Sequence, residues 1–374
     1  MLRKQESAAL LKPAYALGCV FLTASLLVAN GCSGHSSPNP PPGSPQQNVE
    51  FAYVANQGGS ISGYSVNSST GALTLLNGFP LTVGENPSFV THDPQGRFLV
   101  MADIAAALVH VYSINTTTGA LSEISPSPYP VAGEPHAVAF DPSGKFMYVV
   151  GEQFGNIAAF TVDANGVLST VPGSPFAFGG LVPNSVVVNS TSQFIYVADV
   201  HNIYTFTINA STGAPTLASS VTGPTQPDGL ALDPAGSLLY AVGAGSNSIE
   251  SYTINSSTGA LTPAQSSPMA LQNGAFAIAI DPFGKFAYTS ENDQSVVAYT
   301  LQRGAFTHIA TYPGALGSLQ LAIDPSGSFL YAPQTGNENN LSGFLVNASG
   351  ELSAVPGSPT PTGHAPMSVT LVSE

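Results

Sequence analysis

Histidine and carboxylate side chains carry most of the chemistry available in this sequence. The sharpest candidate is His136, which follows Glu134 and Pro135 at the start of a short apolar run. A neutral imidazole can act as a general base or bind a metal, and a carboxylate can act as an acid, a base or a cation ligand. The other candidates at comparable positions are Asp103, Glu152, Asp199, His201, Asp228, Glu291, Asp293 and His364.

A metal centre is one interpretation of these side chains. His136, His201 and His364 with neighbouring carboxylates would suit a transition metal, and the acidic segments 291–293 and 337–340 offer oxygen ligands for calcium. No two of the three histidines have the close spacing of a metal-binding motif. We therefore expect no cofactor, with a divalent metal as the alternative. The remaining histidines of the repeat region, which we interpret as packing or surface residues, are His92, His110 and His308.

The candidates are distributed over an internal repeat. Runs of the type F-h-Y-V-A-N, where h is apolar, begin at positions 51, 98, 146, 194, 238, 286 and 329. Seven copies with a period between 43 and 48 residues are typical of a repeat architecture. Charged residues make up only 7% of the chain, whereas it contains 38 Gly and 31 Pro, so turns rather than helices are favoured.

One copy shows the elements that must position the candidates. Residues 135–140, 146–150, 157–162 and 167–171 read as four short strands, and D-P-S-G-K (141–145) has the residue order of a type I turn. Four antiparallel strands repeated seven times predict an all-β, seven-bladed β-propeller. We interpret the Asp-Pro pairs as architectural.

Two further features complete the predicted ring. The phrase N-S-S-T-G and its variants link the third and fourth strands, and Gly71, Gly119, Gly213 and Gly259 fit positions with φ > 0. Residues 366–372 match the first-strand pattern, although they lie at the end of the chain. We therefore expect them to pair into the blade begun by residues 51–78, so that no open sheet edge remains.

The N-terminal region predicts export. Basic residues precede an apolar run over 14–29, and Cys32 follows small residues, as in a bacterial lipoprotein signal. An ordinary cleaved signal and an uncleaved anchor are the alternatives. We assign 1–31 to the signal segment, 32–49 to a Pro-, Ser- and Gly-rich tether, and 50–374 to the propeller, with Cys32 as the lipidation site. The expected location is the bacterial cell envelope, in the periplasm or on the outer surface.

Charge narrows the range of partners. The chain has a net charge of −14, and without residues 1–31 it keeps four basic and 20 acidic residues, so that 4 − 20 = −16. Nucleic acids and anionic membrane surfaces are therefore excluded as partners, apart from membrane attachment through a lipid anchor. We expect a monomer that binds an unidentified small ligand or an envelope protein.

The copies, P-x-x-h-x-h-D-P-x-G-+-F-h-Y-V with + basic, resemble those of the seven-bladed lactonase family named for 6-phosphogluconolactonase. The resemblance covers about 51–374. It implies a site with Pro-His before one inner strand, which Pro135-His136 matches, followed by Asp and Arg in the next loop. Here Gly151 and Asn156 stand at those two positions. The family's later Arg-His pair is replaced by Asp228-Gly229.

These departures set the functional hypotheses. Ligands meet a propeller at one channel mouth, and the candidates lie just before the inner strands or just after the second strands. Because uncharged or acidic residues stand where the family carries Arg and His, our first hypothesis is a non-catalytic exported scaffold. It would bind a ligand or a partner at the mouth bearing His136. A divergent lactonase or hydrolase is the alternative, and a metal-dependent periplasmic enzyme is a third. Whether the protein is an enzyme stays open at this point.

Overall fold

The computed structural model describes residues 50–151, 153–314, 318–335 and 339–373. The expected signal segment, the tether with Cys32, and Glu152 lie outside the described residues. Among those residues, no helix is long and apolar enough to cross a membrane.

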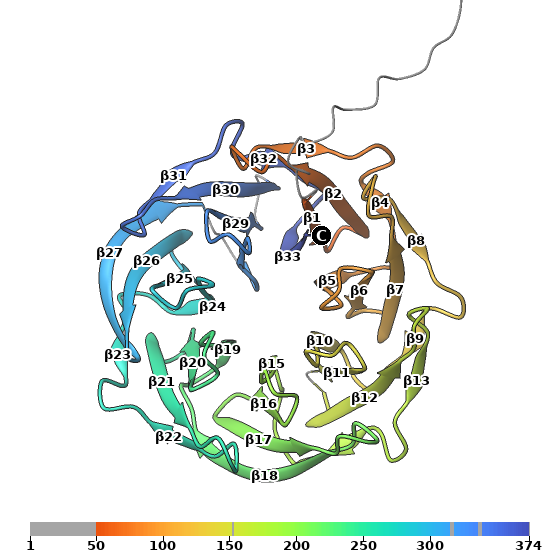
Figure 1. Cartoon of the computed structure of the whole chain (residues 1–374), viewed down its shortest axis with the longest axis vertical. Helices are drawn as coiled ribbons and strands as arrows, with labels where there is room; N and C mark the ends of the chain where they lie inside the picture. The colour runs from red at the N-terminus through yellow and green to blue at the C-terminus, as the bar shows by residue number, and fades with distance from the viewer. Residues whose placement is uncertain (1–49, 152, 315–317, 336–338, 374) are drawn as a thin grey trace, which may run out of the picture. The chain divides into compact units, whose positions relative to one another are not determined.

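Seven antiparallel sheets form a ring around a central channel, which confirms the predicted seven-bladed β-propeller (Figure 1). The inner strands of blades 1 to 7 are β33 (Pro366–Ser373), β5 (Pro87–His92), β10 (Pro135–Phe140), β15 (Ser185–Val188), β19 (Pro227–Leu232), β24 (Ala275–Ile280) and β28 (Ala322–Ile323). The second strands are β1 (Glu50–Asn56), β6 (Phe98–Asp103), β11 (Phe146–Gly151), β16 (Phe194–Ala198), β20 (Leu238–Gly243), β25 (Phe286–Glu291) and β29 (Phe329–Gln334). The third strands are β2 (Ser60–Val66), β7 (Leu108–Ile114), β12 (Asn156–Val162), β17 (Asn202–Ile208), β21 (Ser248–Ile254), β26 (Ser295–Gln302) and β30 (Asn340–Val346).

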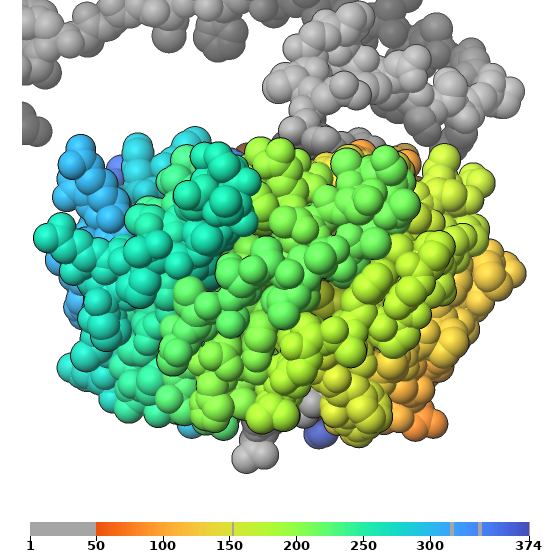
Figure 2. All heavy atoms as spheres, turned by 90° about the horizontal axis from the view of Figure 1, so that it is seen from below, coloured from red at the N-terminus to blue at the C-terminus, as the bar shows by residue number. Residues whose placement is uncertain are grey.

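The outer strand differs from the prediction of one continuous fourth strand. It is continuous only in blades 4 and 6, as β18 (Pro215–Thr222) and β27 (Ala305–Pro313). In the other blades two short segments share its place: β3 (Leu73–Leu75) and β4 (Leu81–Thr82), β8 (Leu121–Glu123) and β9 (Tyr129–Pro130), β13 (Leu168–Thr170) and β14 (Phe176–Ala177), β22 (Leu261–Pro263) and β23 (Met269–Ala270), and β31 (Leu352–Ala354) and β32 (Thr360–Pro361). Figure 2 shows the ring from its edge, where successive parts of the chain follow one another around the molecule.

A Ser-Pro pair explains four of these breaks. Proline has no N–H for the ladder, so it is tolerated at such an edge position. In blade 3 the preceding residue, Ser174, accepts the N–H of Ala159 on the third strand at 2.9 Å. Ser127, Ser267 and Ser358 do the same for Val111, Ser251 and Gly343 at 2.9 to 3.0 Å. The hydroxyl thus replaces the ladder bond that the broken strand leaves open.

The repeated glycine phrase joins neighbouring blades. The Tyr148 hydroxyl of blade 3 donates to the Gly213 carbonyl of blade 4 at 2.9 Å. Gly213 has φ +78°, and a Cβ there would lie 2.3 Å from the Phe146 ring, so only glycine fits. The equivalent hydroxyl-to-carbonyl pairs, at 2.6 to 3.1 Å, are Tyr53–Gly119, Tyr196–Gly259, Tyr288–Gly350 and Tyr331–Gly71.

The Asp-Pro turns lie together at one end of the ring, which we call the turn face (residues 93–97, 141–145, 189–193, 233–237, 281–285 and 324–328). Asp141 is buried, and its Oδ1 accepts the Phe146 N–H at 2.7 Å. Asn189, the one departure from Asp, accepts the Phe194 N–H in the same way at 2.8 Å. These side chains therefore hold the turns, as the architectural interpretation predicted.

The C-terminal strand closes the ring, as predicted. β33 pairs antiparallel with β1, with Val54 opposite Val369. It also contacts blade 2, because the Ser368 hydroxyl accepts the Val90 N–H at 2.9 Å. Apolar side chains fill the space between adjacent sheets. The largest buried ones include the tyrosines whose hydroxyls donate to glycine carbonyls of the next blade, which we call the clamp tyrosines. The core is therefore distributed between the blades.

Candidate functional site

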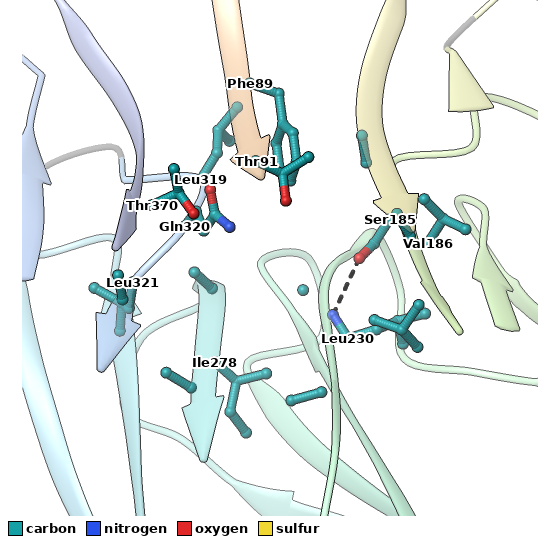
Figure 3. A pocket seen from close by; sticks show the side chains of 18 of the residues that line it. Phe89, Thr91, Ser185, Val186, Leu230, Ile278, Leu319, Gln320, Leu321 and Thr370 are labelled. Carbon is teal, nitrogen blue, oxygen red and sulfur yellow. Dashed lines mark hydrogen bonds between the residues drawn. The ribbon is translucent and has the colours of Figure 1, made fainter. Parts of the chain in front are cut away.

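A cavity of about 590 Å³ occupies the channel between the inner strands. Its wall is mostly apolar, with Val186, Leu230 and Ile278 on one side (Figure 3). On the other side, Thr91 and Thr370 and the amide of Gln320 point into the open space (Figure 3). The lining therefore combines apolar side chains with a few polar groups.

One of these polar groups, the Gln320 amide, is fixed by bonds between blades. With its nitrogen turned toward the neighbouring carbonyls, the Gln320 amide donates to Val90 and Val369 at 3.2 Å each. Gln320 precedes the short strand β28 and so reaches blades 1 and 2 from blade 7. This side chain braces the seam of the ring.

His92 lies at the turn-face end of the cavity, so the interpretation as a mere packing or surface residue was incomplete. Its Nδ1 lies 2.7 Å from the Thr370 hydroxyl, across the junction of blades 2 and 1. Burial lowers the pKa of His92, with the charge of Asp93 opposing the shift. The imidazole is therefore neutral near pH 7.

Three polar side chains border the cavity at the opposite mouth. His136, Asn184 and Asp228 each stand five residues before the turn residue of blades 3, 4 and 5, and all three border the cavity. Asn184 Nδ2 donates to Asp228 Oδ1 at 3.1 Å. We call these three residues the polar arc. The sequence analysis names His136 and Asp228 as candidates, and the structure adds Asn184.

The amide oxygen of Asn184 is a distinctive feature of the polar arc. It is buried and has no hydrogen-bond partner within the described part of the chain. A buried carbonyl without a partner costs free energy, and strain, a bound water or ion, or a functional role can account for it. Equivalent positions in blades 6, 7 and 1 hold Phe276, Leu319 and Met367, so the far side of this mouth is apolar.

Close packing explains the glycines at two family positions. A Cβ on Gly151 would lie 2.4 Å from the Glu134 carbonyl oxygen, because the segment before His136 crosses there. A Cβ on Gly229 would lie 3.0 Å from the Cα of Ala277 in the next blade. Side chains cannot enter at either position without moving backbone. Glu134 itself accepts a bond from Gln153 Nε2 at 2.6 Å, beside the mouth.

Two predicted members of the binding face instead hold loops. The buried Asp103 carboxylate accepts the N–H groups of Glu85 and Asn86 at 2.6 and 3.0 Å. The buried Asp199 carboxylate accepts the N–H groups of Leu181 and Asn202 at 2.9 and 2.7 Å. Asp103 is the last residue of β6 and Asp199 follows β16, and the carboxylates of both accept bonds from the backbone.

Glu291 and Asp293 are likewise engaged within their own blade. Glu291 is buried and accepts the Tyr299 hydroxyl at 3.0 Å. Burial raises its pKa, and the bonds from Tyr299 and Thr289 oppose that shift. Asp293 accepts a bond from Asn273 Nδ2 at 2.9 Å and is exposed.

The predicted histidines are not brought together. His201 and His364 are exposed and do not border the cavity that His136 lines. Within the described ranges, no group of three or more His, Cys, Asp or Glu side chains is placed to hold a metal ion. His308 is exposed on an outer strand, whereas His110 is buried and bonded to Glu123 at 2.8 Å.

The four basic side chains of the described residues lie away from the polar arc. Arg97 pairs with Asp93 at 2.8 Å on the turn face. Lys145 and Lys285 lie over Phe146 and Phe283, also on the turn face. Arg303 occupies the turn between β26 and β27. None of them borders the cavity.

Comparison with known proteins gives the family. The model of the lactonase family, described as a 7-bladed β-propeller, matches residues 45–140 and 126–276. The chain belongs to this lactonase family. This confirms the resemblance inferred from the repeat. No curated protein matches the chain.

Solved structures of lactonase-like propellers share the fold. A putative 6-phosphogluconolactonase from Bacteroides uniformis superposes with a TM-score of 0.77 at 18% identity, covering 87% of this chain and 100% of its own. The periplasmic gluconolactonase of Pseudomonas aeruginosa has a TM-score of 0.74 at 19% identity, covering 87% and 99%. A putative 6-phosphogluconolactonase from Bacteroides fragilis has a TM-score of 0.76 at 18% identity, covering 88% and 99%. At these identities the similarity concerns the fold alone.

Proposed function

We propose that the protein hydrolyses an uncharged lactone at the polar arc. The observation that carries the proposal is that His136, Asn184 and Asp228, from three successive blades, border one mouth of a cavity of about 590 Å³, with Asn184 bonded to Asp228. Membership of the lactonase family supports the reaction class.

The arc contains the groups that lactone opening needs. Hydrolysis requires a base to activate water and a donor to stabilise the oxyanion that forms on the carbonyl oxygen. We assign the base to His136, which takes a proton from the attacking water and returns it to the ring oxygen as the acyl C–O bond breaks. The Asn184 amide has two N–H groups, of which one is given to Asp228. The second is the donor that we assign to the developing oxyanion, with Asp228 fixing the orientation of the amide.

The charge distribution favours an uncharged substrate. A phosphorylated lactone is normally held by Arg or Lys side chains. No basic residue of the described chain borders the cavity, and Asp228 adds negative charge to its mouth. A phosphate group would therefore be repelled, whereas a neutral lactone would not.

We also propose that the reaction takes place outside the cytoplasm. The basic and apolar segment within 1–31, followed by Cys32, supports export. The similarity to a protein described as a periplasmic gluconolactonase is consistent with this location. Attachment through Cys32 remains part of the proposal.

The test compares two histidines at the same mouth. Lactone hydrolysis by the purified protein is followed by acid release in a pH-stat, with glucono-1,5-lactone and its 6-phosphate as substrates. We expect turnover of the neutral lactone only, and a loss of about 10²–10⁴-fold in kcat for His136→Ala. His201→Ala, an exposed residue outside the cavity, should keep wild-type activity. Equal activity of His136→Ala and wild type would refute the assignment.

A second candidate function is binding without catalysis. It is favoured by Gly151, Asn156, Asp228 and Gly229, which stand where active family members are expected to carry charged side chains. In that case calorimetry should detect binding of a neutral lactone that weakens in Asn184→Ala, while the pH-stat records no acid release.

A further inference from the structure

Three large apolar side chains are exposed beside the polar arc. Phe154 is 62% exposed, Leu181 63% and Val182 36%. We call these three residues the apolar rim. Most of the other large apolar side chains of the described blades are buried, so this group needs an explanation.

The apolar rim lies in two segments that touch each other and lead to the arc. The Phe178 N–H donates to the Gly155 carbonyl at 3.0 Å. A Cβ on Gly155 would lie 2.0 Å from the Gly180 oxygen, so the two backbones are in close contact. Along the chain, Val182 is two residues before Asn184. Gln153, next to Phe154, is bonded to Glu134, two residues before His136.

The backbone fixes this exposure. The Leu181 N–H donates to Asp199 Oδ2 at 2.9 Å, and its carbonyl accepts the Val200 N–H at 3.2 Å. Val182 has φ +54°, a left-handed conformation that is costly for a β-branched residue. Leu181 is thus held in place with its side chain facing solvent.

We infer that the lactone substrate is amphiphilic: its ring binds at the polar arc, and an alkyl or acyl chain attached to the ring lies on the apolar rim. The inference rests on the proposed function. The rim adjoins the two arc residues assigned to chemistry, and it is uncharged, so an apolar chain is the ligand part that it complements. Burial of each additional methylene should strengthen binding about fourfold, until the alkyl chain is longer than the rim.

The test measures binding separately from turnover. Neutral δ-lactams carrying ethyl, hexyl or decyl groups resemble the lactone but resist hydrolysis. Their affinities for the full-length protein are measured by calorimetry. We expect affinity to rise steeply from ethyl to hexyl in the wild type. The double variant Phe154→Ser, Leu181→Ser should lose most of this rise while binding the ethyl compound normally.

The matched control is on the turn face. Phe283 is 65% exposed, as much as the rim residues, but belongs to an Asp-Pro turn at the opposite end of the ring. Phe283→Ser should leave the dependence on chain length unchanged. Melting temperatures of all variants should match the wild type, because the replaced side chains are exposed.

Each outcome decides a specific point. Affinity independent of chain length in the wild type would overturn the inference. A chain-length dependence that persists in the double variant would place the chain inside the channel, which also overturns the rim assignment. A wild-type dimer in sedimentation that dissociates in the double variant would assign the rim to a second copy instead. If lactam affinity depends on alkyl-chain length but no lactone is hydrolysed, the proposed reaction is refuted and the apolar rim is still assigned to binding the alkyl chain.

Discussion

The two ends of the channel are built on opposite principles. On the turn face, six blades carry an Asp or Asn whose Oδ1 accepts the N–H five residues later, at 2.6 to 2.8 Å. At the other mouth, the position five residues before the turn residue, or its equivalent in β33, holds a different residue in every blade: Ser88, His136, Asn184, Asp228, Phe276, Leu319 and Met367.

This contrast separates architecture from chemistry. A side chain that recurs with the same bonds in blade after blade solves a folding problem common to all blades. The symmetry is broken at the mouth, where three successive blades contribute a His, an Asn and an Asp. In a repeat protein, unequal residues at equivalent positions are therefore the best guide to the site.

The largest expected effect comes from removing the strand shared by both ends. Deletion of residues 366–374 removes β33, which pairs with β1 and contributes the fully buried Val369. The inner edge of β1 would then be unpaired, and the apolar core between blade 1 and its neighbours, blades 2 and 7, would be exposed. We expect loss of the cooperative thermal transition followed by circular dichroism. If the truncated protein melts like the full-length protein, neither end of the channel depends on a closed ring, and this prediction is wrong.

The next prediction sets one aspartate from each end against the other. Asp141 is buried and accepts bonds from Phe146 N–H and from the hydroxyl of Ser192 at 2.9 Å. Asp141→Ala should therefore lower the free energy of unfolding by about 2–4 kcal/mol. Asp228→Ala should cost less than about 1 kcal/mol, because Asp228 is only partly buried.

Activity should respond in the reverse order. Asp141→Ala should retain lactone hydrolysis below its melting temperature, whereas Asp228→Ala should lose most of it because the Asn184 amide is no longer oriented. Urea unfolding and pH-stat assays on both variants provide the measurements. Equal losses of stability at the two positions would erase the distinction between the ends.

The sequence predicted the part of the molecule that repeats. The Asp-Pro turns, the glycines of the N-S-S-T-G phrase and the closing strand each follow from residue types with narrow conformational preferences. The broken outer strands were missed because the signal is a Ser-Pro pair, whose hydroxyl bond to Ala159 and its equivalents appears only once the strands are paired.

The site was predicted only in part, for a physical reason. Position after a second strand places Asp103 and Asp199 near the mouth, but it does not tell whether a carboxylate faces the channel or the backbone of its own loop. The importance of Asn184 depends on its bond to Asp228 in the next blade, at a separation of 44 residues. Local sequence carries no information on such a contact.

A third prediction concerns an exception near the turn face. Glu50 begins β1 at the seam of the ring; it is buried, and its Oε1 has no partner among the described residues. Burial, with the nearby charge of Asp324, raises the pKa of Glu50 to about 7 from 4.5. Because the folded state binds this proton more tightly, its contribution to stability is complete below about pH 4.5 and is lost as the pH rises through about 7.

Glu50→Gln removes this titration. At pH 8 the variant should be more stable than the wild type by about 1–2 kcal/mol. This is less than the full pKa shift would give, because solvent screens part of the electrostatic effect. At pH 4.5 the two proteins should be equally stable, since both side chains are then neutral when folded. Urea unfolding at both pH values gives the difference. A variant that is destabilised at pH 8 would mean that the ionised Glu50 makes a stabilising interaction in the folded state, which would contradict this prediction.

The smallest effect is expected at the clamps between blades. Tyr148→Phe removes the hydroxyl that donates to the Gly213 carbonyl at 2.9 Å and leaves the ring in place, so the expected loss is about 1 kcal/mol. Tyr331→Phe, which breaks the bond to Gly71 across the seam, should cost the same. Because the two clamps lie in different blades, their losses of stability should add in the double variant.

His136→Ala and Asn184→Ala should instead be non-additive in their effect on activity, because the polar arc acts as one unit. Additive losses of unfolding free energy at the clamps and non-additive losses of kcat at the mouth would therefore distinguish the repeated architecture from the site.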